Sequence, residues 1–257
     1  MFTIVVAYIM ARPFNPSIYF VADPSLCGGR DIVDVVVAAL RGGITMVQYR
    51  NKSGDMKKIY AEAAELAELL KFVPSPPSLC PSPLSPHVGR GGRDVEAWYG
   101  EAGPSRSWEG GEGIPFIVND YIDVAFAVGA AGVHLGQGDA SPEEAREKLG
   151  AEAIIGQTAF TEEQIRSVNP EYVDYIGLGP FYITKTRKGK PLLGEGNGKR
   201  FRELAALSPV PVVGIGGITP GNAKAVLEAG ADGVAMMRSI SEVPDVEAAA
   251  RAFVWVL

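Results

Sequence analysis

The stretch PVVGIGGITPGNAKAVLEAGADGVAM, residues 211–236, holds the unit that decides the fold of this 257-residue chain. Two short apolar runs, 211–215 and 232–236, flank a segment over 220–229 whose apolar residues recur at helical spacing. Both runs are rich in valine and do not alternate with polar residues, which indicates strands buried on both faces, as in a parallel sheet. We therefore predict a strand–helix–strand unit, with Thr219 and Pro220 starting its helix.

The same alternation runs through the rest of the chain. The other predicted strands are 17–22, 44–49, 115–118, 131–135, 153–156 and 173–178, and the other predicted helices are 31–41, 54–71, 120–129, 141–149, 161–168, 199–207 and 245–255. Ser141 and Thr161 each stand three residues before a Glu or Gln, the pattern of a capping box at a helix start. Eight strands alternating with eight helices predict an α/β fold, a single-domain (β/α)8 TIM barrel over 17–257.

A doubly wound sheet is the alternative architecture for this alternation of strands and helices. Polar and glycine signatures follow nearly every predicted strand. A closed barrel brings all of these strand ends to one mouth, whereas an open sheet does not, so the barrel is favoured.

Two segments depart from the alternating pattern. Residues 73–113 contain 7 Pro, 8 Gly and 6 Ser, a density that excludes a helix or a central strand. They predict a flexible, low-complexity insertion between the second helix and the third strand, on the face away from the barrel mouth, with a partner-docking polyproline segment as the alternative. Residues 1–16 form a predicted N-terminal extension; its apolar start MFTIVVAYIM is too short to span a bilayer and lacks signal-peptide features.

Composition excludes several classes of function. The chain has 24 Lys and Arg against 30 Asp and Glu, a net charge of −6, which argues against a general nucleic-acid binder. Its 2 cysteines cannot build a disulfide framework or a cysteine-rich zinc site, and we find no apolar run long enough to cross a membrane. We expect a soluble, cytoplasmic protein that acts on small molecules and can form a homo-oligomer.

Charged residues at the ends of three predicted strands suit a metal-bound polyphosphate. Gln48, Arg50 and Lys52 occupy alternate positions and so project to one side, where Arg and Lys can bind phosphate oxygens. Asp120 and Asp139 follow two neighbouring strands and can share one Mg²⁺ ion. The alternatives are a solvated charged turn for the cations, a helix cap for Asp120 and a turn residue for Asp139.

Glycines point to a second anion site. Residues 214–218 (GIGGI) follow one predicted strand, and a helix start is expected after the run 232–236; together they are typical of the phosphate site of barrel enzymes. The loop 177–190 carries hydroxyls and four cations, and we expect it to be a binding loop. His134 is interpreted as a structural, hydrogen-bonded residue, and with His87 in the insertion a histidine-based zinc site or catalytic triad is hard to assemble.

Taken in order, these motifs resemble the thiamine-phosphate synthase family. The resemblance covers 17–72 and 114–240 and rests on the segments QYRNK (48–52), ND (119–120), GVHLGQGD (132–139), DYIGLGP (174–180) and GIGGI (214–218). It implies a (β/α)8 transferase that joins 4-amino-2-methylpyrimidine methyl diphosphate to a thiazole phosphate, with Mg²⁺ as cofactor. The products would be thiamine phosphate and diphosphate.

The resemblance also implies roles for individual residues. Arg50 and Lys52 would be catalytic and, with Gln48 and Asn119, would hold the pyrimidine diphosphate; Asp120 and Asp139 would bind Mg²⁺. Thr158 would lie near the pyrimidine. The thiazole phosphate side would be formed by Thr184, Thr186, Arg187, Gly217, Met237 and Arg238.

Three departures from the family pattern fall on or near the thiazole side. Arg187 replaces the usual lysine, Phe160 replaces a histidine, and Met237 with Arg238 replaces a small hydrophobic residue and a serine. Two rival functions use the same scaffold: a TenI-like thiazole tautomerase and a non-catalytic phosphate-ligand binder. Phe160 counts against the tautomerase, whose proton shift uses that histidine, and the two aspartates favour chemistry over binding alone.

Overall fold

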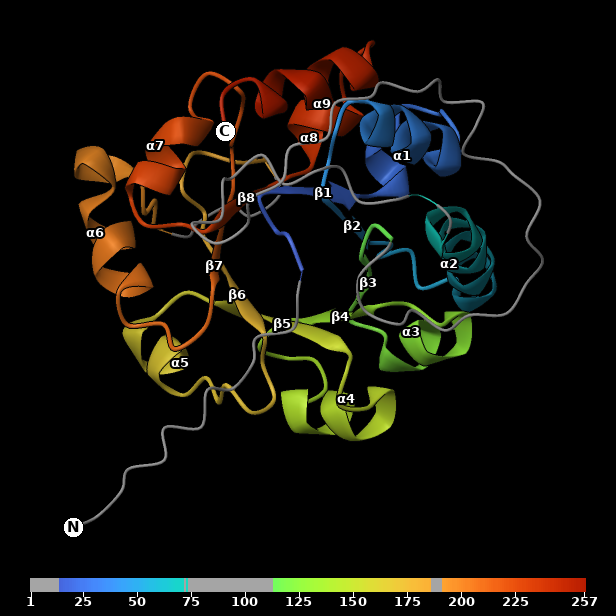
Figure 1. Cartoon of the computed structure of the whole chain (residues 1–257), viewed down its shortest axis with the longest axis horizontal. Coiled ribbons are helices and arrows are strands. Elements are labelled where there is room, and N and C mark those ends of the chain that lie inside the picture. Colours follow the sequence, from blue (N-terminus) through green and yellow to red (C-terminus); the bar gives the residue numbers. More distant parts are fainter. Residues whose placement is uncertain (1–13, 72, 74–112, 186–190) are drawn as a thin grey trace, which may run out of the picture.

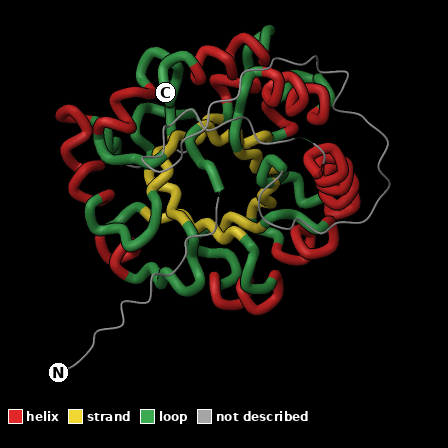
Figure 2. Tube along the Cα trace, in the orientation of Figure 1, coloured by secondary structure: helices red, strands yellow, loops and turns green. Residues whose placement is uncertain are grey.

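The computed structural model describes residues 14–71, 73, 113–185 and 191–257. Eight parallel strands pair in chain order, and β8 pairs with β1 to close a barrel, which helices surround (Figures 1 and 2). The strands are β1 (Ile18–Ala22), β2 (Met46–Tyr49), β3 (Phe116–Asn119), β4 (Gly132–Leu135), β5 (Ile154–Ala159), β6 (Tyr175–Leu178), β7 (Val212–Ile215) and β8 (Gly233–Met236). The predicted TIM barrel is thus confirmed, and the doubly wound alternative is wrong because the sheet has no open edge.

Eight of the described helices fall close to the predicted ranges, a short helix follows β8 where a helix start is predicted, and the 3₁₀ helix after β1 is not predicted. They are the 3₁₀ helix η1 (Pro24–Leu26) and α1 (Ile32–Arg41), α2 (Met56–Lys71), α3 (Ile122–Val128), α4 (Pro142–Leu149), α5 (Glu162–Arg166), α6 (Glu195–Ala205), α7 (Ala223–Glu228), α8 (Arg238–Ser241) and α9 (Val246–Val254). The predicted capping boxes at Ser141 and Thr161 are both present. No described helix is both long enough and apolar enough to cross a membrane.

One predicted helix start is wrong. Thr219 does not cap α7, which begins at Ala223, because the Asn222 side chain accepts a hydrogen bond from the Thr219 backbone N–H at 2.8 Å. That contact closes a turn over 219–222, and the residues after Pro220 are therefore not helical. The predicted helix over 199–207 agrees with the structure, because the regular part of α6 begins only after the left-handed residues Gly196, Asn197 and Gly198.

The barrel separates two apolar cores. The larger one lies between the strands and the surrounding helices and includes Phe20, Val118 and Phe201. The smaller one fills the barrel and consists of Tyr19, Val21, Met46, Ile117, Ala131, Ile154, Tyr175, Val213 and Ala235, with Phe14 packed against it. Each large apolar side chain buried in these cores contributes roughly 1.5–3 kcal/mol, so the apolar residues on both sides of the sheet stabilise the closed barrel.

A repeated side-chain contact fixes the N-terminal rim of the barrel. Thr45 Oγ1 accepts from the Ile18 N–H at 3.0 Å, Asp174 Oδ2 from Ile155 at 2.7 Å and Asp232 Oδ2 from Val212 at 2.7 Å. In each case the residue just before one strand accepts a hydrogen bond from an N–H near the start of the strand that precedes it in the chain: β1 for β2, β5 for β6 and β7 for β8. Backbone donors that would otherwise be orphaned are thereby paired, and the opposite rim remains for loops that carry chemistry.

The predicted insertion joins the barrel at one point. Of its residues only Val73 and Gly113 are described, as 74–112 lie outside the described part of the chain, and so do residues 1–13 of the predicted extension. The Ile114 N–H donates to the Val73 carbonyl at 3.1 Å, which draws the end of α2 to the start of β3. The junction therefore lies at the N-terminal rim.

We predict that replacing 74–112 with a short Gly/Ser bridge leaves the barrel folded. The two ends already meet, and shortening a loop changes the closure entropy by only about 0.6 kcal/mol per halving of its length. Urea unfolding should give a free energy of unfolding equal to or slightly above that of the full chain. A large loss of stability would show that 74–112 packs on the barrel.

Candidate active site

A cavity of about 620 Å³ opens at the C-terminal ends of the strands. It is lined by every predicted site residue that the structure describes: Gln48, Arg50, Lys52, Asn119, Asp120, Asp139, Thr158, Thr184, Gly217, Met237 and Arg238. Thr186 and Arg187 lie outside the described residues. Residues from seven segments, one at or after each of the strands β2 to β8, therefore meet at one mouth.

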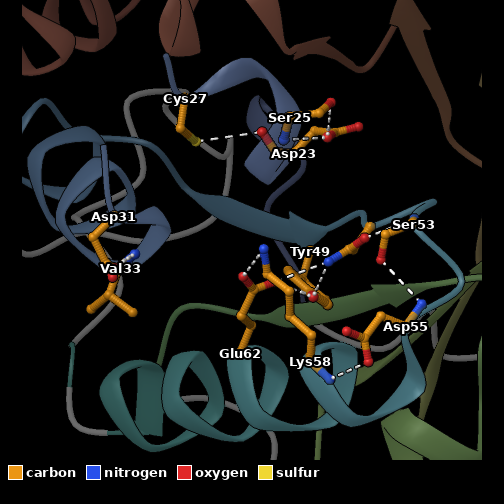
Figure 3. A network of polar contacts seen from close by, with 11 residues as sticks. Asp23, Ser25, Cys27, Asp31, Val33, Tyr49, Ser53, Asp55, Lys58 and Glu62 are labelled. Carbon is orange, nitrogen blue, oxygen red and sulfur yellow. Dashed lines mark hydrogen bonds and ion pairs between the residues drawn. The ribbon is translucent and has the colours of Figure 1, made fainter. Parts of the chain in front are cut away.

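Side chains at the end of β2 and in the turn that follows point alternately to two sides. Gln48, Arg50 and Lys52 line the cavity, while Tyr49 and Asn51 are buried on the other side. There the Tyr49 hydroxyl donates to Glu62 of α2 at 2.6 Å, and Asn51 Nδ2 donates to the same carboxylate at 3.0 Å (Figure 3). The alternation of a strand thus anchors one set of side chains to α2 and aims the other at the cavity.

Asp23 holds Arg50 in place. Its carboxylate accepts from the backbone N–H of Ser25 at 3.0 Å and from the Ser25 hydroxyl at 2.6 Å (Figure 3). It also forms an ion pair with the Arg50 guanidinium. Asp23 is only 4% exposed, so this pair is well shielded from water. Sequence reasoning missed Asp23, whose one visible signal is its place directly after β1.

Two carboxylates face each other at the tops of β3 and β4. Asp120 forms an ion pair with Lys52, and Asp139 Oδ2 accepts from the Gly136 N–H at 2.6 Å. Burial raises the pKa of the Asp120 carboxyl above its usual range; Lys52 lowers it, and the nearby Asp139 adds to the rise. Asp120 also has a left-handed backbone (φ 67°), and such rarely adopted conformations cluster at functional sites.

This pair of carboxylates fits a hard divalent cation. Mg²⁺ in proteins commonly takes one or two carboxylates and completes its octahedron with water and substrate phosphates. Two neighbouring acids, one with a raised pKa, are a donor set that a cation would stabilise. Among the described residues no group of three His, Cys, Asp or Glu side chains comes together, so a metal here would rely on these two acids and the ligand.

Asn119 presents an unused donor beside this pair. It is 8% exposed and lines the cavity, and its Nδ2 has no hydrogen-bond partner among the described residues. A buried amide donor without a partner costs about 1–3 kcal/mol, which a bound acceptor would recover. The free N–H groups therefore point to an anionic or carbonyl-bearing ligand.

Away from the cations of β2, the wall of the cavity includes the backbone that follows β7. Gly216 and Gly217 have left-handed φ values of 104° and 65°, and a Cβ on Gly217 would lie 2.5 Å from the Ile183 carbonyl oxygen. Two consecutive glycines are thus required where the chain turns after β7. The loop after β6 is tied to this turn, because the Tyr182 N–H donates to the Gly216 carbonyl at 2.9 Å.

The remaining predicted residues on this side are also placed around the cavity. Arg238, at the start of α8, lines the cavity and forms an ion pair with Glu242 one turn further along. Phe160 presents an apolar ring to the same cavity. The three family departures seen in the sequence thus include two that face the cavity, Phe160 and Arg238.

His134 has the hydrogen bonds expected of a structural histidine and also lines the cavity. Its Nδ1 lies 3.1 Å from the Tyr175 hydroxyl and its Nε2 lies 2.9 Å from Thr158 Oγ1. Tyr19 and Tyr175 reach the cavity from inside the barrel and were not predicted as site residues. The alternation of strand residues could have found Tyr175, because residues two apart point to the same side and Tyr175 is followed at this spacing by Gly177 and Gly179, which also line the cavity.

The fold, with its cavity at the carboxyl ends of the strands, is typical of (β/α)8 barrel enzymes. The model of a family described as thiamine monophosphate synthase matches residues 18–73 and 106–240. Thiamine-phosphate synthase of Azorhizobium caulinodans is 35% identical over 94% of this chain and 95% of its own length, and that of Natronomonas pharaonis is 34% identical over 91% of each. The structure of thiamine phosphate pyrophosphorylase from Pyrococcus furiosus matches with a TM-score of 0.67 at 26% identity, covering 94% of this chain and 96% of the other. The chain belongs to the thiamine monophosphate synthase family.

We predict that Asp23→Ala weakens the binding of inorganic diphosphate about tenfold, because an unrestrained Arg50 must be ordered on binding. Asp31→Ala is the matched control, since Asp31 is an exposed acid in the same loop that also caps a helix and does not contact Arg50. Titration calorimetry with Mg²⁺ present measures both variants. Unchanged or tighter binding by Asp23→Ala would contradict a positioning role.

Proposed function

We propose that this protein is a Mg²⁺-dependent thiamine-phosphate synthase, which joins 4-amino-2-methylpyrimidine methyl diphosphate to a thiazole phosphate and releases diphosphate. The observation that carries this proposal is the division of one cavity. Cations and paired carboxylates line it on the side of β2 to β4, and the glycine turn lines it after β7. Such a cavity has room for a diphosphate on one side and a monophosphate on the other.

The diphosphate side is formed by Arg50, Lys52 and Asn119. The guanidinium can donate two parallel hydrogen bonds to phosphate oxygens, and Lys52 adds a point charge. Lys52 has a side chain that is 49% exposed, so it can swing from Asp120 to an incoming anion. These donors stabilise negative charge as it develops on the departing diphosphate.

Asp120 and Asp139 would hold Mg²⁺ against the diphosphate oxygens. When bound, the ion would neutralise charge on the leaving group. Asp139 is oriented for this by the Gly136 N–H, and Asp120 by the β3–β4 pairing, in which its own N–H donates to the His134 carbonyl at 2.9 Å. The carboxylate of Asp139 and the backbone of Asp120 are thus fixed by contacts that need no ligand.

The thiazole phosphate side is formed by the backbone at Gly217, with Thr184, Met237 and Arg238 around it; Thr186 and Arg187 extend the same loop in sequence. Backbone N–H groups in a left-handed turn form a concave anion site. Arg238 adds a cation where the family pattern has a serine, and we expect it to strengthen phosphate binding.

The reaction needs positioning more than acid–base catalysis. The bond between the pyrimidine methylene carbon and the diphosphate oxygen breaks, and its electron pair leaves with diphosphate. The electron-rich aminopyrimidine stabilises the cation that remains, and the lone pair of the thiazole nitrogen forms the new C–N bond. The protein neutralises the leaving group and holds the two partners in line, which accounts for a cavity with cations at one end.

The rival functions fit this cavity less well. Phe160 cannot move a proton where a thiazole tautomerase would use a histidine. A binder of phosphate ligands would have no use for two adjacent carboxylates that repel its ligand. A cytoplasmic location and a homo-oligomeric state stay predictions from the sequence.

We predict that the metal-stripped protein, mixed with both substrates, forms thiamine phosphate only after Mg²⁺ is added. Asp120→Asn and Asp139→Asn should each abolish most of this turnover, and Asn tolerates the left-handed backbone at position 120. Asp123→Asn is the control, because Asp123 is a 71% exposed acid on α3 that pairs with Lys148. Full activity of either site variant, measured by chromatography of the product, would contradict a shared cation.

We predict that Arg50→Ala and Lys52→Ala each lower kcat as well as raise KM for the pyrimidine diphosphate. A charge-assisted hydrogen bond is worth about 1.5–3 kcal/mol, or roughly ten- to over a hundredfold in rate. Arg50→Lys should recover only part of the activity, since a point charge does not replace the planar guanidinium.

Lys57→Ala, an exposed lysine on α2, is the control for these steady-state measurements. Wild-type constants in all three site variants would show that the cations merely cap the turn after β2.

A further inference from the structure

A chain of hydrogen bonds crosses the inside of the barrel beneath the cavity. Gln48 Nε2 donates to the Tyr19 hydroxyl at 2.7 Å, and the Tyr19 hydroxyl lies 2.8 Å from that of Tyr175. The Tyr175 hydroxyl lies 3.1 Å from His134 Nδ1, and His134 Nε2 lies 2.9 Å from Thr158 Oγ1. The five residues come from β2, β1, β6, β4 and β5, and we call them the interior relay.

The interior relay has a direction. An amide nitrogen can only donate, so the Tyr19 oxygen accepts from Gln48 and its single proton points to Tyr175. Tyr175 in turn donates to His134 Nδ1. A neutral imidazole that accepts at Nδ1 carries its proton on Nε2, and that proton is donated to Thr158. The hydroxyl proton of Thr158 is the last donor of the series.

Burial holds this arrangement in one state. Tyr19 and Tyr175 are 1% and 0% exposed, and burial raises the pKa of both phenols far above the ordinary value, so each remains a neutral donor. Space for the rings of Tyr175 and His134 depends on Gly156 of β5. A Cβ there would lie 2.2 Å from Tyr175 Cζ and 2.5 Å from His134 Nδ1.

The two ends of the relay face the cavity with opposite polarity. At one end the nitrogen of Gln48 is engaged by Tyr19, so its oxygen remains as an acceptor. At the other end Thr158 offers its hydroxyl proton. Gln48 also keeps its second amide N–H, but the Thr158 oxygen already accepts from His134, so the pair favours a heterocycle that gives a donor to the Gln48 oxygen and an acceptor to Thr158. An aminopyrimidine, with an exocyclic NH₂ beside a ring nitrogen, meets this condition, and its oxo analogue presents the reverse.

We propose that Tyr19, Tyr175 and His134 are positioning residues: they fix the amide of Gln48 and the tautomer of His134, and so make the cavity selective for an amino- over an oxopyrimidine. The choice of substrate class rests on the proposed synthase function. The direction of the relay does not, because it follows from contacts within the ligand-free protein.

The direction is tested by the ¹⁵N chemical shifts of His134 in the full-length, ligand-free protein at pH 8.5. The chain has 2 histidines, so His87→Gln assigns the signals. We expect a protonated Nε2 and an unprotonated Nδ1 in the wild type. Gln48→Glu is nearly isosteric, and its carboxylate, with an ordinary pKa of about 4.3, accepts where Gln48 donates. It should reverse each bond in the series and move the proton of His134 to Nδ1.

Selectivity is tested with the 4-amino and 4-oxo pyrimidine diphosphates on one enzyme preparation. The ratio of their kcat/KM values should fall by about tenfold or more in Tyr175→Phe and Tyr19→Phe, since the end groups can then rotate. Because both substrates share the same folded fraction, loss of stability alone does not move this ratio. Tyr172→Phe, on the opposite rim of the barrel, should leave it unchanged.

The outcomes separate the two proposals. A His134 tautomer in Gln48→Glu that is the same as in the wild type overturns the relay, whatever the activity. An active wild type whose substrate ratio is unaffected by either tyrosine variant overturns its role in selectivity. A wild type that makes no thiamine phosphate overturns the proposed function and the substrate class, while the ¹⁵N shifts still decide the relay.

Discussion

Closure of the sheet between β1 and β8 is the constraint on which the rest of this molecule depends. Ile18, Tyr19 and Phe20 pair with Val234, Ala235 and Met236, and the Val234 N–H extends the ladder to the Ser17 carbonyl at 3.1 Å. With no edge left open, every strand has two neighbours and an interior face. That interior holds the small inner core and the interior relay, and its upper end is the cavity. Closure also sets the cations after β2 across from the glycines after β7, which lie far apart in sequence.

Much of this arrangement could be predicted from the sequence because it depends on local patterns. Continuous apolar runs gave the strands, and capping residues such as Ser141 gave helix starts. Residues following a strand were assigned to one mouth because parallel strands in a barrel all end there. The candidate site from Gln48 to Arg238 follows from that rule together with strand parity and the family resemblance.

The parts that could not be predicted depend on contacts between distant segments. Asp23 looks like a turn residue until the paired ends of β1 and β2 bring it to Arg50. Tyr19 and Tyr175 look like core residues, and only the register of several strands places their hydroxyls 2.8 Å apart. Thr219 failed as a helix cap for a local reason, since Asn222 competes for the same turn.

The electrostatics of the cavity reconcile an acidic chain with anionic ligands. The net charge is −6, yet the two cations that follow β2 and line the cavity are each held by an acid, Arg50 by Asp23 and Lys52 by Asp120. Pairing lowers the cost of keeping these cations partly out of water while the cavity is empty of ligand. Because the side chain of Asp23 is 5% exposed and that of Lys52 is 49% exposed, the first pair is suited to persist and the second to exchange.

The hydrogen bond between Ile114 and Val73 has an evolutionary consequence. It brings the two described ends of the α2–β3 connection together, on the rim opposite the cavity. We therefore expect changes of length or composition between these two residues to leave the cavity lining unaltered. The loops of the other rim have less freedom, since those that follow β2 to β8 all contribute residues to the cavity lining. We accordingly expect insertions and deletions to accumulate at the N-terminal rim of this barrel, while selection preserves the residues of the C-terminal rim that line the cavity.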